Sequence, residues 1–190
     1  MVALLAFTVF LPVFLLIAGL LWVAHKGNPF FLQVRPGKNE RLFRIIKFKT
    51  MTNARDKEGN LLPDSERLTT AGKFIRRTSL DEIPQLLNVL KGDMSLVGPR
   101  PEVPEYVRAY PERDRETVLS VRPGLTDYAA LEFKKESELL DEAHDPERVY
   151  LEEILPQKLA LYRSYVENAG LATDVALILR TVKALLAKGE

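Results

Sequence analysis

The longest apolar run of the chain stands at its N-terminus. Met1–Ala24 carries no charged residue and is interrupted only by Thr8, Pro12 and Gly19. Such a run is long enough to cross a bilayer as a helix, which takes about 20 residues. A secretory signal peptide fits poorly, because no basic residue precedes the run and the run exceeds the usual ~7–15 apolar residues. We therefore expect residues 1–26 to form a membrane-embedded helix and residues 27–190 to form the domain that follows it.

Pro12 lies in the middle of this run and removes a backbone donor, so it kinks or breaks a helix there. Two arrangements stay open from the residues alone: a kinked transmembrane span, or two half-helices that enter and leave the same leaflet. Eight basic residues and one acid, Glu40, lie between Lys26 and Arg55. Basic residues beside an apolar helix favour the cytoplasmic side, so we expect the rest of the chain there.

Shorter apolar segments after the N-terminal run predict a small α/β domain. Turn signals bracket a strand at Phe30–Val34, and a second strand at Leu42–Thr50 would complete a short β-hairpin. Alternation along the second strand puts Lys47 and Lys49 on one face. Two lysines there could bind anionic lipid, bind a substrate phosphate, or only be solvated.

Helical segments dominate the remainder, after a polar loop at residues 53–64. Thr69 or Thr70 would cap the first helix, and Arg76 and Arg77 at its end would complement the helix dipole. The expected helices are Thr70–Arg77, Pro84–Leu90, Pro146–Asn168 and Leu171–Ala187. Apolar stripes on the last two either pack in the core or lie at the lipid interface. We predict an α/β fold that is mostly α: a small helical domain with a short β-hairpin and a Pro-kinked N-terminal helix.

Composition narrows the function classes. Lys plus Arg number 27 against 26 for Asp plus Glu, which argues against general nucleic-acid binding. The chain has no cysteine, so disulfides, thiolate zinc sites and cysteine nucleophiles are excluded. His25 and His144 are its two histidines, and their separation argues against a histidine-based metal site or a Ser-His-Asp triad. A length of 190 residues fits one domain of ordinary size.

The densest chemistry lies in Thr78–Pro101, TSLDEIPQLLNVLKGDMSLVGPRP, where Asp81 and Glu82 are adjacent. Ser79 and Glu82 have the S-x-x-E spacing of a capping box, which would give Glu82 a purely structural role. Pro84 argues against that role, because a proline there removes a helical amide, and the helix would instead begin at Pro84. Near a helix N-terminus, one carboxylate could attack phosphorus while the other manages a proton or holds a metal. Mg²⁺ is the expected ion.

Two arginines stand in rigid turns: Arg100 in Gly98–Pro101, and Arg122 in an Arg-Pro-Gly turn. A rigid mount suits bidentate contacts to phosphate, because less ordering entropy is lost on binding. Carboxylates and arginines held together indicate phosphate chemistry.

These motifs resemble those of the bacterial sugar transferase family. The similar segments are KFKTM at Lys47–Met51, SLDEIPQLLNVLKGDMSLVGPRP at Ser79–Pro101 and VRPGLTD at Val121–Asp127. Members of that family are monotopic phosphoglycosyl transferases, which move a sugar 1-phosphate from a UDP-sugar to polyprenol phosphate and initiate polysaccharide or glycan assembly. The resemblance implies that Asp81 attacks the β-phosphate of a Mg²⁺-bound UDP-sugar and that UMP leaves. Polyprenol (undecaprenol) phosphate then takes the phosphosugar from the covalent intermediate.

By the same resemblance, Asp81 and Glu82 are the catalytic pair, with Asp81 also at the metal. The residues expected to bind substrate are Lys47, Arg76, Arg100 and Arg122. The family's membrane helix is broken at a Ser-Pro and re-enters the leaflet, so the resemblance favours a re-entrant helix with Pro12 at the break. It also implies a bacterial inner-membrane location, with a cytoplasmic catalytic domain over residues 27–190 and interfacial C-terminal helices that contact membrane lipid.

The chain also departs from the family pattern. Leu11 replaces the serine before the proline, and the charged residues that precede the membrane helix are absent, so we expect the chain to start late, through truncation or a misassigned start. Thr126–Phe133 differs from the commoner TGLAQVNG, which leaves the sugar open. Polyprenol length, pathway and oligomeric state are not predicted by the sequence.

Two other function classes stay open. One is a membrane-anchored protein that binds a UDP-sugar or a lipid phosphate without chemistry, and the other is a soluble phosphotransferase with a cleaved leader. The complete Asp81–Glu82 pair favours the enzyme, because a binding protein needs no nucleophile.

Overall fold

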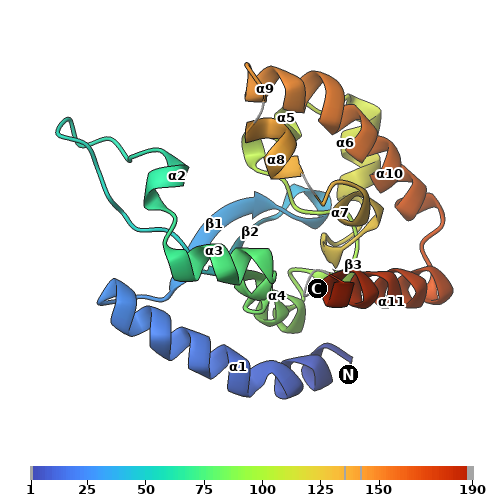
Figure 1. Cartoon of the computed structure of the whole chain (residues 1–190). Helices are drawn as coiled ribbons and strands as arrows, with labels where there is room; N and C mark the ends of the chain where they lie inside the picture. The colour runs from blue at the N-terminus through green and yellow to red at the C-terminus, as the bar shows by residue number, and fades with distance from the viewer. Residues whose placement is uncertain (1, 135, 142, 188–190) are drawn as a thin grey trace. The chain divides into compact units, whose positions relative to one another are not determined.

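The computed structural model describes residues 2–134, 136–141 and 143–187. Over these residues it is a mostly helical α/β structure with two small sheets, β1–β2 and β3–β4, and an apolar N-terminal helix (Figure 1). Most η elements are 3-10 helices, and η3 is a π-helix. The elements in chain order are α1 (Val2–His25), β1 (Phe30–Pro36), η1 (Lys38–Glu40), β2 (Leu42–Phe48), α2 (Asp64–Arg67), α3 (Thr70–Arg77), η2 (Leu80–Glu82), α4 (Gln85–Lys91), β3 (Ser95–Val97), α5 (Pro104–Arg108), α6 (Glu112–Leu119), β4 (Gly124–Thr126), α7 (Tyr128–Glu132), α8 (Glu136–Asp141), α9 (Pro146–Val149), η3 (Tyr150–Ile154), α10 (Leu155–Glu167) and α11 (Leu171–Ala187).

The predicted hairpin and helices are present, with small shifts at their ends. Strand β1 runs two residues past Val34, and β2 ends two residues before Thr50. The long helix predicted from Pro146 is formed by α9, η3 and α10 in direct succession. The predicted alternation in β2 is wrong, because its buried residues are Ile45 and Phe48, three positions apart.

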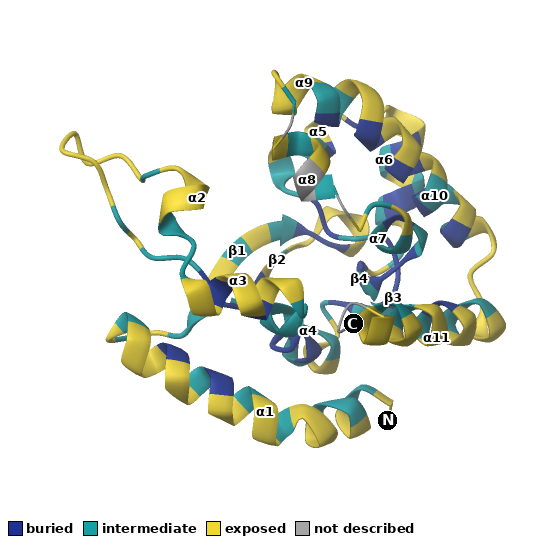
Figure 2. Ribbon diagram, viewed as in Figure 1, coloured by how far each residue is buried: buried dark blue, intermediate teal, exposed yellow. Residues whose placement is uncertain are grey.

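Helix α1 runs without interruption through Pro12, and its ribbon bends in the N-terminal half (Figure 1). Among the described residues, it is the one helix long and apolar enough to cross a membrane. Phe14 stacks on Phe30 and packs against Phe48, with ring centroids 5.8 and 5.3 Å apart. Most of the rest of α1 is exposed, as Figure 2 shows, which indicates membrane association. Whether α1 spans the bilayer or re-enters the leaflet stays a prediction.

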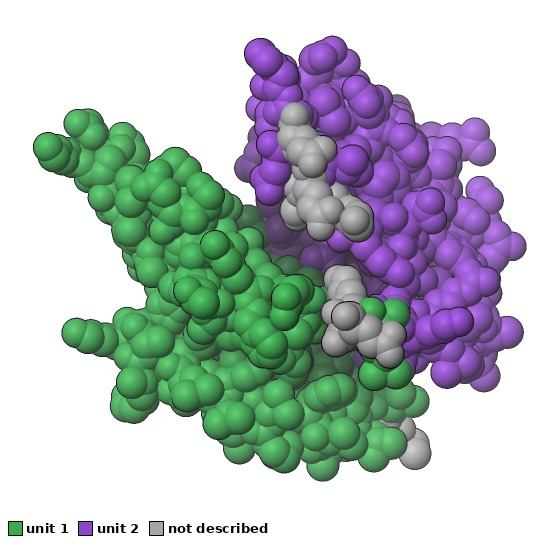
Figure 3. All heavy atoms as spheres, in the orientation of Figure 1, with its two compact units in different colours: residues 1–33, 45–90, 185–190 green, residues 34–44, 91–184 purple. Residues whose placement is uncertain are grey.

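Close contacts divide the chain into two compact units, coloured separately in Figure 3. Unit 1 holds residues 1–33, 45–90 and 185–190, and unit 2 holds residues 34–44 and 91–184. The boundary between the units crosses β1, β2 and α11, so these three elements contribute residues to both.

In unit 1, helix α3 packs against the end of β2. A Cβ atom added to Gly72 of α3 would come within 2.1 Å of the Thr50 carbonyl oxygen, so only glycine fits there. Thr69 caps α3 by accepting a hydrogen bond from Gly72 N at 2.9 Å, and its hydroxyl donates to Thr50 O at 3.2 Å. Within β2, the amide of Ile46 donates at 3.0 Å to the side-chain oxygen of the buried Asn88 of α4. These contacts fix the Lys47–Met51 segment against α3 and α4.

In unit 2, strands β3 and β4 pair in parallel, with Ser95 opposite Gly124 and Val97 opposite Thr126. A Cβ atom added to Gly124 would lie 2.2 Å from Gly98 N. The Gly98-Pro99 turn and the Pro123-Gly124 turn therefore lie so close together that only glycine fits at positions 98 and 124. This small parallel sheet joins the segments that carry Arg100 and Arg122, and the sequence patterns did not predict it.

The two C-terminal helices differ in their surroundings. Leu159 and Tyr162 of α10 are buried in the main core of unit 2, so the core interpretation of that apolar stripe is correct. Helix α11 buries Leu177 but leaves Leu179 and Leu186 64% and 73% exposed. Contact of α11 with lipid stays a prediction.

Candidate active site

The Asp81–Glu82 pair lies on the short 3-10 helix η2, directly before α4. Ser79 precedes it in the left-handed conformation, with φ of 57°, and its side chain makes no capping hydrogen bond. The capping box is therefore wrong. The helix begins after Pro84, as the alternative predicted, and α4 ends at Lys91 with Gly92 at positive φ behind it. Asp81 and Glu82 are each partly exposed, at 13% and 21% of their side-chain area.

Lys47 contacts both carboxylates from β2. Its ammonium Nζ lies 2.8 Å from Glu82 Oε1 and 4.0 Å from Asp81 Oδ2. The hydrogen bond from Ile46 N to Asn88 explains this approach, because it fixes the strand next to Lys47 against the helix that follows the pair. Unit 1 thus brings together three predicted site residues from two distant motifs. The positive charge of Lys47 offsets part of the negative charge of Asp81 and Glu82.

Arg76 lies in the last turn of α3, where its charge complements the helix dipole, and its side chain also contacts the segment after β2. Its Nε donates to Thr50 Oγ1 at 2.9 Å, and its Nη2 lies 3.6 Å from the Met51 sulfur. Arg76 is therefore tied to the Lys47–Met51 segment. No sequence pattern pointed to Thr50 or Asn88 as the residues that hold this part of unit 1 together.

Arg100 belongs to unit 2, where its backbone is held on both sides. Its amide donates to Asp127 Oδ2 at 2.7 Å, and the next carbonyl, of Pro101, accepts from Arg35 Nη1 at 3.0 Å. Asp127 also accepts from Ala130 N at 2.6 Å and so caps α7. Burial raises the pKa of Asp127 to about 6, while the Ala130 hydrogen bond and the charge of Arg100 oppose that rise.

Arg122 also belongs to unit 2 and is exposed at the turn before β4. Its carbonyl lies so near Gly98 that a Cβ atom there would come within 2.5 Å. The rigid mount predicted for both arginines is thus present in the backbone. Their assignment as substrate-binding residues stays a prediction.

A buried ion cluster follows directly after the Arg100 turn. Glu102 Oε1 lies 2.5 Å from Lys158 Nζ of α10, and the same ammonium lies 3.2 Å from both Glu136 Oε2 and the Tyr150 hydroxyl. The charge of Lys158 lowers the pKa of Glu102 against the burial that raises it. The sequence interpretation missed Lys158, although helical spacing places it between Leu155 and Tyr162 on the apolar face of α10.

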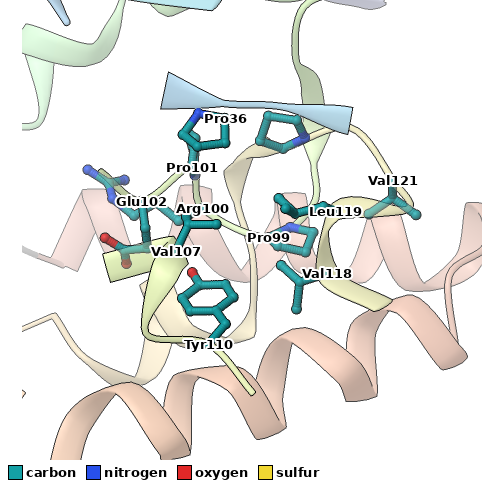
Figure 4. Close-up of a pocket in the computed structure, with 11 residues that line it drawn as sticks. Pro36, Pro99, Arg100, Pro101, Glu102, Val107, Tyr110, Val118, Leu119 and Val121 are labelled. Carbon is teal, nitrogen blue, oxygen red and sulfur yellow. The ribbon is translucent and has the colours of Figure 1, made fainter. Parts of the chain in front are cut away.

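Figure 4 shows a small pocket beside this turn, lined among others by Pro36, Pro99, Arg100 and Tyr110. Its volume is about 10 Å³, room for roughly one water molecule. The pocket is a packing gap around the proline-rich turn and is too small for a nucleotide.

Asp81 and Glu82 fit a metal ion that is bound jointly by the protein and the phosphates of the substrate. Among the residues that the structure describes, no group of three or more His, Asp or Glu could hold an ion by itself. Mg²⁺ usually keeps several waters and takes one or two carboxylates plus substrate phosphates. Asp81 and Glu82 supply that number of carboxylates.

These features define a class: a membrane-associated protein with a lysine-held carboxylate pair and rigidly mounted arginines. The chain belongs to the bacterial sugar transferase family, whose sequence model matches residues 1–188.

Named relatives of the chain include sugar-phosphate transferases. It is 51% identical over 120 residues to the uncharacterized sugar transferase EpsL of Bacillus subtilis (strain 168), covering 60% of this chain and 59% of EpsL. It is 35% identical over 191 residues to the UDP-N-acetylgalactosamine-undecaprenyl-phosphate N-acetylgalactosaminephosphotransferase of Aeromonas hydrophila, covering 97% of this chain and 41% of the relative. The UDP-glucose:undecaprenyl-phosphate glucose-1-phosphate transferase of Caulobacter vibrioides is 35% identical over 181 residues, covering 93% and 64%. The chain thus spans between 41% and 64% of the length of these three relatives.

Proposed function

We propose that this protein is a Mg²⁺-dependent phosphoglycosyl transferase that moves a sugar 1-phosphate from a UDP-sugar to undecaprenol phosphate and so initiates assembly of a membrane-bound polysaccharide. The observation that carries the proposal is the Asp81–Glu82 pair with Lys47 against it. The names of the relatives from A. hydrophila and C. vibrioides contain both a UDP-sugar and undecaprenyl phosphate, which supports this substrate class.

In the first step, a carboxylate oxygen of Asp81 attacks the β-phosphorus of the UDP-sugar. A bond forms between Asp81 and phosphorus, the bond from phosphorus to the bridging oxygen breaks, and UMP leaves with that oxygen. The Lys47 ammonium is closer to Glu82 than to Asp81, so it reduces the charge of the pair without a short contact to the nucleophile. Mg²⁺ held by Asp81 and the substrate phosphates would offset the charge of the diphosphate.

In the second step, an oxygen of undecaprenol phosphate attacks the same phosphorus. The bond from Asp81 to phosphorus breaks, the carboxylate is restored, and the product is a lipid diphosphate sugar. Glu82 takes up the proton of a monoanionic acceptor phosphate, and its hydrogen bond to Lys47 orients it for that role. Arg76, Arg100 and Arg122 bind the phosphates of the two substrates.

The two-step course is tested by loading the purified protein with Mg²⁺ and a UDP-sugar but no lipid acceptor. UDP-glucose and UDP-N-acetylgalactosamine are the first donors, chosen from the names of the relatives. We expect up to one equivalent of UMP and a protein mass increased by one phosphosugar. Asp81→Asn should lower turnover on the order of 10⁴-fold, because it removes the nucleophile. Donor binding without UMP or adduct in a wide donor panel would instead identify a binding protein.

The membrane part of the proposal places α1 as a re-entrant helix in the inner membrane, with the remainder on the cytoplasmic face. Pro12 within α1 and the basic residues that follow support it. The chain has no cysteine, so a single Val2→Cys variant carries an unambiguous label. Membrane-impermeant thiol reagents should label it from the cytoplasmic side, and labelling only from the periplasmic side would show a spanning helix.

A further inference from the structure

The turn that carries Arg100 is anchored at five successive residues. The contacts are Gly98 N to Thr126 O at 3.0 Å, Gly124 N to Pro99 O at 3.0 Å, Arg100 N to Asp127 Oδ2 at 2.7 Å, Arg35 Nη1 to Pro101 O at 3.0 Å and Lys158 Nζ to Glu102 Oε1 at 2.5 Å. All of these residues belong to unit 2. The backbone of this turn is therefore fixed by its surroundings, and with it the direction of the Arg100 Cα–Cβ bond.

Among these contacts, the one from Asp127 acts on Arg100 itself. Pro99 and Pro101 have no amide hydrogen, so the Arg100 N–H is the only backbone donor in this three-residue segment. Its orientation determines where the Cα–Cβ bond of Arg100 points. Asp127 is 1% exposed, and it therefore cannot touch a substrate directly.

Capping of α7 uses only one of the two carboxylate oxygens of Asp127. Its Oδ1 accepts from Ala130 N, which is the usual N-cap contact and needs one oxygen. The second oxygen, Oδ2, is used for Arg100 N instead. A residue that only capped the helix would not require a buried carboxylate with two acceptors, since serine caps a helix as well.

We infer that Asp127 is a positioning residue for Arg100: its carboxylate ties the Arg100 amide to the start of α7 and so fixes the direction in which the Arg100 side chain leaves the turn toward a substrate diphosphate. This inference rests on the proposed function. It also gives a role to the Thr126–Phe133 segment, where the chain departs from the commoner family sequence. Within that segment, Asp127 holds the backbone of the turn that carries Arg100.

Asp127→Ser is the most informative variant. A serine keeps the cap on Ala130 N, so α7 remains formed, but its single short hydroxyl does not also reach Arg100 N. Asp127→Asn is the second variant, because its amide keeps the shape and presents an NH₂ group to one of the two N–H donors. Asp114→Asn is the matched control: Asp114 is another buried carboxylate of unit 2, paired with Arg163 away from the turn.

Two measurements follow on the full chain in detergent. The first is UMP release as a function of UDP-glucose and UDP-N-acetylgalactosamine concentration, in wild-type and Arg100→Ala backgrounds. The second is hydrogen exchange at the Arg100 amide. We expect Asp127→Ser to raise KM about tenfold with kcat within twofold, and to change little once Arg100 is alanine. Exchange at the Arg100 amide should be at least tenfold faster, and Asp114→Asn should change neither quantity.

Each outcome separates the inference from the proposed function. If the wild type releases no UMP from any donor, the proposed function fails, and the Arg100 exchange rate still decides whether Asp127 holds that amide. Unchanged exchange in both Asp127 variants overturns the inference. So does an equal loss of kcat in the wild-type and Arg100→Ala backgrounds, because a general loss of structure would act independently of Arg100.

Discussion

Two lysine–glutamate pairs in the described part of the chain have the same chemistry in different surroundings, one in each unit. In unit 1, Lys47 lies 2.8 Å from Glu82, and both side chains keep 21% of their area exposed. In unit 2, Lys158 lies 2.5 Å from Glu102, and the two side chains keep 4% and 10%. The first pair has a third charged neighbour in Asp81, and the second has Glu136 and the hydroxyl of Tyr150.

This difference in burial suits the two lysine–glutamate pairs to different roles. A partly exposed pair contributes little to stability, because water competes for both partners. Its lysine can exchange one acceptor for another, as the proposed phosphate binding requires. A buried pair has no such freedom, and removing one partner leaves an uncompensated charge in the interior. The Lys47 pair is therefore suited to chemistry, and the Lys158 pair to fixing the turn after Arg100.

The largest stability effect that follows from this comparison belongs to Lys158→Met. The substitution leaves Glu102 buried without its cation, so we expect it to lower the free energy of unfolding by about 3–5 kcal/mol. The measurement is the thermal or denaturant midpoint in detergent. Adding Glu102→Gln should restore most of the loss, because it removes the unpaired charge. A melting temperature that stays at the wild-type value would mean that the second pair is as dispensable as a surface pair.

Lys47→Met should give the opposite pattern. A hydrogen bond to a charged group contributes about 1.5–3 kcal/mol. If the Lys47–Glu82 bond acts in the transition state, its loss should lower kcat about 10- to 100-fold. Stability should fall by less than it does in Lys158→Met, because the Lys47 pair is the more exposed of the two. UMP release and the unfolding midpoint, measured on one preparation, check both halves. A large stability loss with normal turnover would erase the distinction between the two pairs.

The sequence predicted this first pair only in part. Asp81 and Glu82 were site candidates because they lie in a dense motif, and Lys47 because the family resemblance implied it. The helix start after Pro84 followed from proline chemistry alone. That Lys47 contacts Glu82 was not foreseen, because the contact depends on Asn88 holding β2, a tertiary hydrogen bond with no local signal. Alternation in β2 failed for a related reason, since α1 and α4 bury the strand unevenly.

The second pair was missed entirely. A lysine between apolar helix positions is normally read as a surface residue, and its partner Glu102 lies 56 positions away. Asp127 did offer a signal, because an aspartate three residues before Ala130 at the start of an apolar stretch is a typical N-cap. Its second contact, to Arg100, depends on the parallel pairing of β3 and β4, which three-residue strands do not announce in sequence.

The smallest predicted effects separate a residue that caps a helix from one that has only the capping-box spacing. Thr69 is a true N-cap, so Thr69→Ala should cost about 1 kcal/mol of stability. Ser79 has the capping-box spacing but makes no such bond, so Ser79→Ala should stay within about 0.5 kcal/mol of the wild type. Ser79→Gly should be neutral or stabilising by up to ~1 kcal/mol, because Ser79 has positive φ. Equal losses for Thr69→Ala and Ser79→Ala, measured as unfolding midpoints, would mean that the Ser79 side chain stabilises the start of η2 although it makes no capping hydrogen bond.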